Sequence, residues 1–494
     1  MLLSIFEVIV FAIYLLSLTC IVVYSLGQAH LVYLFIKNRK HHLPEKALEG
    51  NDVPFVTIQL PIYNERYVVE RLLDACAAQD YPKDKFEIQL LDDSNDETLE
   101  IAAAKVAELT AQGYLVEHVR RPERTGFKAG ALAYGLDFAK GDFVAIFDAD
   151  FLPRPEHLRT AMAQFTAPDV GVVQARWEHI NRSYSMFTEM QAFHLDAHFT
   201  VEQLGRNSGG MCINFNGTAG IWRKETIRDA GNWQADTLTE DLDLSYRAQI
   251  KGWRFRYIDA LGAPAELPAE MGAIKSQQYR WMKGGAEVAR KMLGQLWRSE
   301  LSFMHKVHGT LHLLSSSVFV VVLLLGASSV PLIYLKHAVF DGKIGFLLVP
   351  VMFLIASFFS LGIFYLVTML HREKNLFASL RRWGLHYLPF LSLSMGMSLH
   401  NTIAVLQGFS GKKTPFIRTP KFNIVNKADR WQHVTYKNRK IKPSVFAELL
   451  MAAYFGLGIY FCIHFDDMAV LPFLVMQSIG FATIGAMSVR HAFS

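Results

Sequence analysis

Long apolar runs lie at both ends of the sequence, and a region of alternating apolar and polar positions lies between them. The first run, residues 2–36, holds one acid and no basic residue before Lys37, so it is too long and too uncharged at its start for a signal peptide. About 20 apolar residues cross the hydrocarbon core of a bilayer, so we expect a spanning helix over residues 6–26 that extends as a tilted stem. Four further runs of spanning length follow the central region, at residues 311–335, 345–370, 446–464 and 468–489.

A fifth run after the central region, residues 384–409, is less apolar than the others. Polar side chains interrupt it at His386, His400, Asn401 and Gln407, and basic residues flank it on both sides. Because basic segments beside a span stay in the cytoplasm, a single crossing would place one flank on the wrong side of the membrane. We therefore interpret the run as an interfacial or re-entrant helix, with a sixth crossing as the alternative. Five spans are expected.

The basic residues also predict the orientation of the chain. The cluster KNRKHH, residues 37–42, follows the first run and is expected to stay in the cytoplasm with the region behind it. The N-terminus and an acidic loop at Asp466 and Asp467 then lie outside, and the C-terminus lies inside near Arg490. The sequence thus predicts an N-terminal transmembrane helix at residues 1–36 and a cytosolic domain at residues 43–300. A C-terminal membrane region follows at residues 301–494 and contains a basic loop at residues 410–445.

The central region repeats a buried strand followed by a helix. Strands are expected from Val56, Phe86 and Phe143, and helices are expected from Arg66 and around Lys128. Successive units of this kind predict an α/β domain with a parallel sheet, whose ligands gather beyond the carboxyl ends of the strands. Acidic residues follow these strands, so the pattern predicts one acidic crevice.

Two pairs of acids end the expected strands. Asp148 and Asp150, one residue apart, can hold a hard divalent cation that bridges phosphate oxygens, although this spacing is also common in exposed loops. Asp92 and Asp93 end another strand, where Asp93 could accept hydrogen bonds from a base or ribose, or cap the next helix. Lys128 opens a helix and could lie near a phosphate, with an ordinary exposed lysine as the alternative.

Two later motifs supply a backbone turn and a pair of acids. NGTAG, residues 216–220, predicts a tight turn that could approach a sugar closely. TED places Glu240 and Asp241 at a helix start, where helix capping is the alternative role. Displacement of a diphosphate from an anomeric carbon with inversion needs one base for the proton of the attacking hydroxyl. Asp241 is the candidate base, because acids that bind the metal cannot easily also accept the proton.

Composition narrows the class of protein. Of the 494 residues 51% are hydrophobic, which fits one large soluble domain and several membrane spans. The formal net charge of +5 is small for this length and does not suggest a nucleic-acid partner. The four cysteines form no CxxC pair, so neither a disulfide framework nor a zinc site is indicated.

In their order and spacing the motifs resemble the signature of processive family 2 glycosyltransferases, the group of cellulose, mannan, chitin and hyaluronan synthases. The matching stretches cover the whole central domain: LDDSND, KAGAL, FDADF, FNGTAG, TED and Q-x-x-R-W, the last formed by Gln277, Arg280 and Trp281. VQARWEHIN, HFTVEQ, FNGTAGIWR and MSLHNTIA are most similar to the plant cellulose-synthase-like A and C families, which make glucomannan and xyloglucan backbones. PFIRTPK, residues 415–421, resembles the gating-loop pattern F-x-V-T-x-K of bacterial cellulose synthase, but Arg418 replaces the valine.

The resemblance implies an α/β fold with a cytosolic GT-A (Rossmann-like) glycosyltransferase domain inserted between transmembrane helices, with interfacial helices. It assigns donor binding to residues of several motifs: Asp92, Asp93, Lys128, Asp148, Asp150, Gln277, Arg280 and Trp281. Asp148 and Asp150 would bind the diphosphate through Mg²⁺ or Mn²⁺, and Asp241, with Glu240 beside it, would act as the catalytic base. Trp281 would stack on the acceptor sugar at the channel mouth, with an aromatic anchor at the bilayer surface as the alternative.

The expected function is that of a multi-pass enzyme of the inner (plasma) membrane that polymerises hexose from a nucleotide sugar, UDP-glucose or GDP-mannose. The glycan would be β-linked, and the expected linkage is β-1,4. It would leave through the helices of the enzyme, which contact membrane lipid. The sequence does not identify a partner protein for export. Transfer of a single sugar to a lipid acceptor is one alternative, against which Q-x-x-R-W argues. A transporter or channel that only senses a nucleotide sugar is another, and the spans show no sign of inverted repeats.

Overall fold

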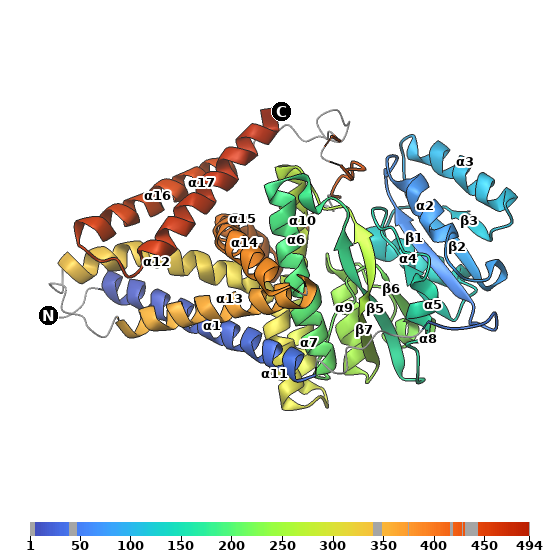
Figure 1. Cartoon of the computed structure of the whole chain (residues 1–494), viewed down its shortest axis with the longest axis horizontal. Helices are drawn as coiled ribbons and strands as arrows, with labels where there is room; N and C mark the ends of the chain where they lie inside the picture. The colour runs from blue at the N-terminus through green and yellow to red at the C-terminus, as the bar shows by residue number, and fades with distance from the viewer. Residues whose placement is uncertain are drawn as a thin grey trace.

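The computed structural model describes residues 5–38, 47–338, 348–373, 375–414, 418–426, 428–429 and 443–493. A seven-stranded sheet with short helices around it forms one end of the molecule, and long helices form the other, with α6 and α10 between them (Figure 1). Most of the basic cluster 37–42 lies outside the described residues, as do Phe416 and residues 430–442 of the expected basic loop.

The sheet is mixed, with the strand order β3-β2-β1-β4-β6-β5-β7. Its strands are β1 Val56–Ile62, β2 Phe86–Asp92, β3 Val116–Val119, β4 Phe143–Ile146, β5 Val170–His179, β6 Gly220–Arg223 and β7 Arg254–Ala265. The expected parallel pairing is confirmed for β1 with β2 and with β4. It is wrong for β6, which runs antiparallel to both β4 and β5.

The direction of β6 follows from the path of the chain. After β5 the chain passes through α6 and α7, Met186–Ala197 and Gln203–Ser208, and then returns toward the sheet from the carboxyl end of β4. Gly220 therefore pairs with Ile146, the last residue of β4. An antiparallel neighbour needs no crossover helix, and here it brings the turn at residues 216–219 to the edge where the acids gather.

Helices cover both faces of the sheet. They are α2 Val69–Ala77, α3 Thr98–Ala111, α4 Phe127–Phe138, α5 His157–Met162, α8 Lys224–Asp229 and α9 Glu240–Ile250. Short 3₁₀ turns lie at Lys83–Lys85 and Arg182–Tyr184, and a third, Ser315–Ser317, precedes α12 in the bundle. Alternate strand residues point to opposite faces, so Ile58 and Leu60 pack with Leu72 of α2, whereas Ile146 packs with Leu132 of α4. This packing fixes the strand ends and hence the crevice beyond them.

The remaining helices form the bundle: α1 Ile5–Lys37, α10 Met271–Arg298, α11 Phe303–Leu313, α12 Val318–Ala338, α13 Leu348–Glu373, α14 Leu376–Gly396, α15 Ser398–Ser410, α16 Ser444–His464 and α17 Leu471–Phe493. Within the described ranges, five helices are long and apolar enough to cross a membrane: Ile5–Lys37, Ser315–His337, Pro350–Glu373, Ser444–His464 and Leu471–Phe493. This number agrees with the expected five spans. The first helix is longer than residues 6–26, and the run at 384–409 belongs to α14 and α15, which are not among the five.

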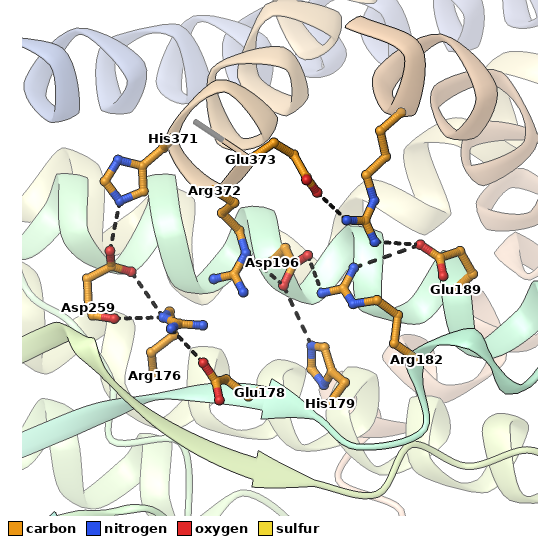
Figure 2. Close-up of polar contacts among 11 residues, drawn as sticks. Arg176, Glu178, His179, Arg182, Glu189, Asp196, Asp259, His371, Arg372 and Glu373 are labelled. Atoms are coloured by element: carbon orange, nitrogen blue, oxygen red, sulfur yellow. Dashed lines mark hydrogen bonds and ion pairs between the residues drawn. The ribbon is translucent and has the colours of Figure 1, made fainter. Parts of the chain in front are cut away.

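Ion pairs join the sheet domain to the ends of α13 and α14 (Figure 2). Asp196 of α6 accepts a hydrogen bond from Arg182 at 2.5 Å and lies 3.5 Å from Arg372 of α13. Asp259 of β7 lies 2.8 Å from His371, and Arg382 of α14 lies 2.8 Å from Glu189. Asp196 is buried and the other members are partly buried, and ion pairs in such places favour one docking geometry over others. The network therefore orients the domain on the bundle.

Candidate active site

Four sequence motifs meet beyond the carboxyl end of β4. Lys128, at the start of α4, donates from Nζ to Oδ1 of Asp148 at 2.5 Å and to the carbonyl oxygen of Gly217 at 2.8 Å. The backbone N–H of Asp148 donates to the hydroxyl of Thr218 at 2.9 Å. Gly217 has φ +80°, and a Cβ there would lie 2.9 Å from Oδ2 of Asp241. Only glycine lets this turn lie so close to the candidate base.

Asp241 has the electrostatics of a group that exchanges a proton near neutral pH. Burial and the neighbouring charge of Glu240 raise its pKa to about 7, although Lys128 opposes both effects. Burial also raises the pKa of Glu240. Thr239 occupies the N-cap position of α9, so the capping alternative does not describe Glu240 or Asp241. A partly buried carboxyl with such a pKa suits general-base chemistry.

Lys128 stays charged although it is surrounded by protein. Burial alone would lower its pKa, but the carboxylates of Asp148 and Glu240 raise it above the ordinary value for lysine. A cationic ammonium therefore lies between Asp148 and the turn at Gly217.

The Q-x-x-R-W motif lies on α10 and faces the same pocket through its arginine. Burial lowers the pKa of Arg280, while Asp148, Glu240 and Asp150 act against that effect, so the guanidinium lies in the field of the pocket acids. Its Nη2 donates to the hydroxyl of Thr419 at 2.7 Å. Gln277 is partly buried one helical turn before it. Trp281 packs against the apolar cluster that joins the sheet to α13 and α14.

A segment from far along the chain, residues 418–422, lies across the pocket acids. Lys421 donates to Oδ2 of Asp150 at 2.7 Å, and Arg418 lies 3.0 Å from Glu65. The N–H of Phe422 donates to Glu266 at 2.9 Å. Burial raises the pKa of Glu65 to about 8, and Arg418 and Lys421 oppose that rise.

The two adjacent aspartates at the end of β2 have different partners. Asp93 forms a two-point ion pair with Arg121, at 2.7 Å to Nε and 2.6 Å to Nη2. Asp92 is buried and bonded to His118 at 2.8 Å and to the N–H of Ser94 at 2.8 Å. The carboxylate of Asp93 is therefore paired with a basic side chain, whereas that of Asp92 is hydrogen-bonded inside the fold.

Sequence reasoning missed Glu65, Glu266 and Arg121 as members of this site. Glu65 follows β1 and Glu266 follows β7, so both occupy the strand-end positions that located Asp148. A rule that accepted single acids at strand ends would have found them. Arg121 has no comparable signal, because its partner Asp93 lies 28 positions earlier.

The pocket offers carboxylates to a divalent cation at Asp148 and Asp150. Among the described residues, no three His, Cys, Asp or Glu side chains are grouped as a complete ligand set. Asp148 and Asp150 could therefore supply only part of a coordination sphere, with phosphate oxygens and water as the rest. Carboxylate oxygens are the ligands that Mg²⁺ and Mn²⁺ prefer, so the side chains of Asp148 and Asp150 fit a divalent cation.

The fold defines the class of protein. A mannosyltransferase from Pyrobaculum calidifontis, solved in complex with GDP-Man and Mn²⁺, aligns with 80% of this chain and 99% of that chain, with a TM-score of 0.54 and 20% identity. The mixed sheet with its Rossmann-like units and flanking apolar helices thus has the GT-A architecture. Residues 54–284 match the model of a family described as glycosyltransferase like family 2. This stretch, a little under half of the chain, is thus similar to family 2 glycosyltransferase domains.

Curated relatives agree with this family. Glucomannan 4-beta-mannosyltransferase 7 of Arabidopsis thaliana is 39% identical over 286 residues, which are 55% of this chain and 51% of that protein. Probable glucomannan 4-beta-mannosyltransferase 3 of Oryza sativa subsp. japonica is 36% identical over 366 residues, 72% of this chain and 63% of that protein. The chain spans about half the length of the first relative and less than two thirds of the second.

Proposed function

We propose that the protein is a membrane-embedded, inverting hexosyltransferase that polymerises sugar from a nucleotide-sugar donor into a β-1,4-linked polysaccharide. The donor is GDP-mannose or UDP-glucose, and the relatives named glucomannan 4-beta-mannosyltransferases favour GDP-mannose. The observation that carries the proposal is the meeting of Asp148, Lys128 and Asp241 in one pocket that Arg280 also faces.

The transfer step assigns one task to each of these side chains. Asp241 accepts the proton of the acceptor hydroxyl as its oxygen bonds to the anomeric carbon and the bond from that carbon to the diphosphate breaks. Lys128 and Arg280 stabilise the negative charge that develops on the leaving diphosphate. The step needs no covalent nucleophile, and a single displacement inverts the configuration at the anomeric carbon.

Asp148 and Asp150 would hold Mg²⁺ or Mn²⁺. A divalent cation, when bound, neutralises charge on the diphosphate oxygens. Lys421 then has to leave Asp150 or share it, because its ammonium lies 2.7 Å from the carboxylate. Asp93, held by Arg121, and Gln277 would contribute to binding the donor, and Trp281 would face the acceptor sugar.

The apolar helices support a membrane-bound enzyme, and we assign the catalytic domain to the cytoplasm. Nucleotide sugars are cytoplasmic substrates in this scheme, and the basic flanks of the spans favour the same side. The growing glycan would leave through the bundle behind α10. Transfer of one sugar to a lipid acceptor is the alternative; the Q-x-x-R-W motif on α10, with Arg280 in the field of Asp148, favours polymerisation.

One assay tests the proposal. The full chain, purified in detergent, is incubated with Mg²⁺ or Mn²⁺ and with GDP-mannose or UDP-glucose, and nucleotide release and product size are measured. We expect a high-molecular-weight product that an endo-β-1,4-mannanase or an endo-β-1,4-glucanase degrades, according to the donor. A single sugar on a lipid contradicts polymerisation, and absence of nucleotide release with every donor contradicts the transferase assignment. Asp148→Asn should abolish the reaction, whereas Asp142→Asn, an exposed acid at the other end of β4, should not.

A further inference from the structure

The helical segment from α6 to α7 contains a π-helical turn, His198–Glu202, beside the catalytic pocket. The N–H of Gln203 donates to the carbonyl oxygen of His198, five residues earlier. Such turns are rare, and within α-helices they occur often at functional sites. This one coincides with the HFTVEQ stretch, to which the proposed transfer step assigns no role.

A chain of side-chain hydrogen bonds runs through this turn from the first apolar helix to the catalytic turn. Gln28 of α1 donates to Oε1 of Glu202 at 2.8 Å, and Oε2 of Glu202 lies 2.7 Å from Nδ1 of His198. Nε2 of His198 lies 3.2 Å from Nδ2 of Asn216. Gln203 donates to Oδ1 of Asn216 at 2.7 Å.

The partners fix the direction of every bond in this chain. Because Oδ1 of Asn216 accepts from Gln203, its Nδ2 must donate, and Nε2 of His198 must accept. The proton of the neutral imidazole then lies on Nδ1 and is donated to Glu202. Burial alone would raise the pKa of Glu202, but Arg206 and His198 hold it well below its usual range, so an ionised carboxylate accepts the hydrogen bond from Nδ1–H.

Asn216 is the end of the chain that faces the chemistry. Its own N–H donates to the side-chain oxygen of Gln174 at 3.0 Å, so backbone and side chain are both held. The next residue, Gly217, receives the hydrogen bond of Lys128 and lies against Asp241. A shift of Asn216 therefore moves the backbone that separates the lysine from the candidate base.

The other end of the chain is anchored by close helix packing. Gln28 is 4% exposed. A Cβ at Gly205 of α7 would lie 2.8 Å from the carbonyl oxygen of Leu31, so α1 and α7 meet at backbone contact. This contact gives His198 a rigid support on the side away from the pocket.

We propose that His198 is a positioning residue of the transferase: its Nε2 orients Asn216 and thereby sets the Gly217 turn against Lys128 and Asp241. The inference rests on the proposed function, which supplies the reaction that this turn serves. His198 touches neither donor nor acceptor in this scheme. Its loss should lower kcat and leave the KM for the donor unchanged.

Two substitutions at His198 test the two hydrogen bonds of the imidazole, to Glu202 and to Asn216, one at a time. His198→Asn can keep an N–H near the position of Nδ1, for Glu202, but leaves Asn216 without its acceptor. His198→Gln can place an amide oxygen near the position of Nε2 and so still accept from Asn216. Gln203→Met removes the other hydrogen bond onto the Asn216 side chain with little change of volume. His194→Asn, one turn earlier on α6 and bonded to Tyr365, is the matched control.

The variants are compared with the wild type, in detergent, by steady-state nucleotide release and by thermal unfolding. We expect His198→Asn and Gln203→Met to lower kcat by about 10- to 100-fold with the donor KM within about twofold, since small misplacements at an active site have effects of this size. His198→Gln and the control should stay within about threefold of the wild type. The inference is overturned if the folded His198→Asn keeps wild-type kcat, or if His198→Gln falls as far. Where His198→Asn does not fold, unchanged kcat in Gln203→Met overturns it. A wild type that releases no nucleotide instead refutes the proposed function itself.

Discussion

The ammonium of Lys421 lies 2.7 Å from Oδ2 of Asp150, although 271 positions separate the two residues in the chain. The same segment brings Arg418 to Glu65 at 3.0 Å. Two basic side chains thus occupy the acidic edge where the proposed cation and the diphosphate would bind. Positive side chains and a metal ion compete for the same carboxylates, so this segment should control how easily the pocket accepts a cation.

Lys421→Met should tighten the binding of Mn²⁺ in the absence of nucleotide. Removal of the ammonium frees Asp150 and removes a charge that repels the cation, and a gain of about 1 kcal/mol corresponds to a roughly fivefold lower Kd. Titration of the purified protein, followed by Mn²⁺ electron paramagnetic resonance, measures it. Lys413→Met, an exposed lysine in the same basic region, is the control. Unchanged or weaker Mn²⁺ binding in Lys421→Met would show that Asp150 is not a ligand.

Asp241→Asn should lower transfer by at least about 100-fold, because general-base catalysis contributes about 10²- to 10⁴-fold. The amide keeps the shape of the side chain but cannot accept the proton. Binding of the donor nucleotide should stay within a few-fold of the wild type, since Asp241 is not assigned to it. Nucleotide release and isothermal titration measure the two quantities. Asp236→Asn, an exposed acid in the loop before α9, should leave both unchanged. Polymer synthesis at the wild-type rate by Asp241→Asn would refute the base assignment.

The sequence pattern predicts the part of the fold that rests on local signals. β1, β2 and β4 are apolar runs that end in polar residues, and helices follow the first two, so their place and parallel pairing can be inferred. β6 is only four residues long, and its direction depends on the path through α6 and α7. The break between α14 and α15 at Met397 follows Gly396, but a single glycine within a helical run does not by itself predict a break. Gly396 and Gly480 meet there at backbone contact, which is a long-range packing constraint.

The candidate site also has a part that local sequence signals predict and a part that depends on long-range contacts. Asp148, Lys128 and Asp241 lie at a strand end and two helix starts, and the sequence locates all three. The bond between Lys128 and Asp148, the contact of Gly217 with Asp241 and the salt bridge of Lys421 join distant parts of the chain. Such contacts depend on the fold as a whole, so no spacing in the sequence contains them.

Trp281→Ala should weaken the use of the acceptor more than hydrolysis of the donor. An aromatic stacking contact contributes about 0.5 to 1.5 kcal/mol, which is roughly a 2- to 10-fold effect on acceptor KM. Donor hydrolysis without acceptor should change less. Chain elongation from added oligosaccharides is compared with nucleotide release in their absence. Trp281→Phe keeps a ring and should behave like the wild type. Equal losses of both activities in Trp281→Ala would instead indicate a packing role in the cluster that Trp281 contacts.

Asp196→Asn should destabilise the contact between the domain and the bundle shown in Figure 2. The Asp196 side chain is 2% exposed and faces Arg182, Arg372 and His179. Removal of one partner from a buried ion pair costs about 3 to 5 kcal/mol, because the remaining charges lose their compensation. The thermal unfolding midpoint in detergent should fall markedly. Asp229→Asn removes an exposed pair with Lys251 and should cost no more than about 1 kcal/mol. Equal midpoints for the two variants would show that the network does not hold the domain in place.

The pKa of Asp241 also links the stability of the protein to pH. Burial and Glu240 raise it from 3.8 to about 7 in the folded chain, so the folded state holds its proton where the unfolded state has lost it. The stability associated with the protonated carboxyl is complete below pH 3.8 and is lost as the pH rises through about 7. Asparagine mimics the protonated form at every pH, so the unfolding midpoint of Asp241→Asn should exceed that of the wild type by more at pH 8 than at pH 5.5. Each kcal/mol of difference corresponds to about 2 to 4 °C in a domain of this size. If the difference in unfolding midpoint between variant and wild type stays constant over this pH range, the Asp241 carboxyl titrates at its ordinary value. Asp241 then lacks the environment that general-base catalysis at neutral pH requires.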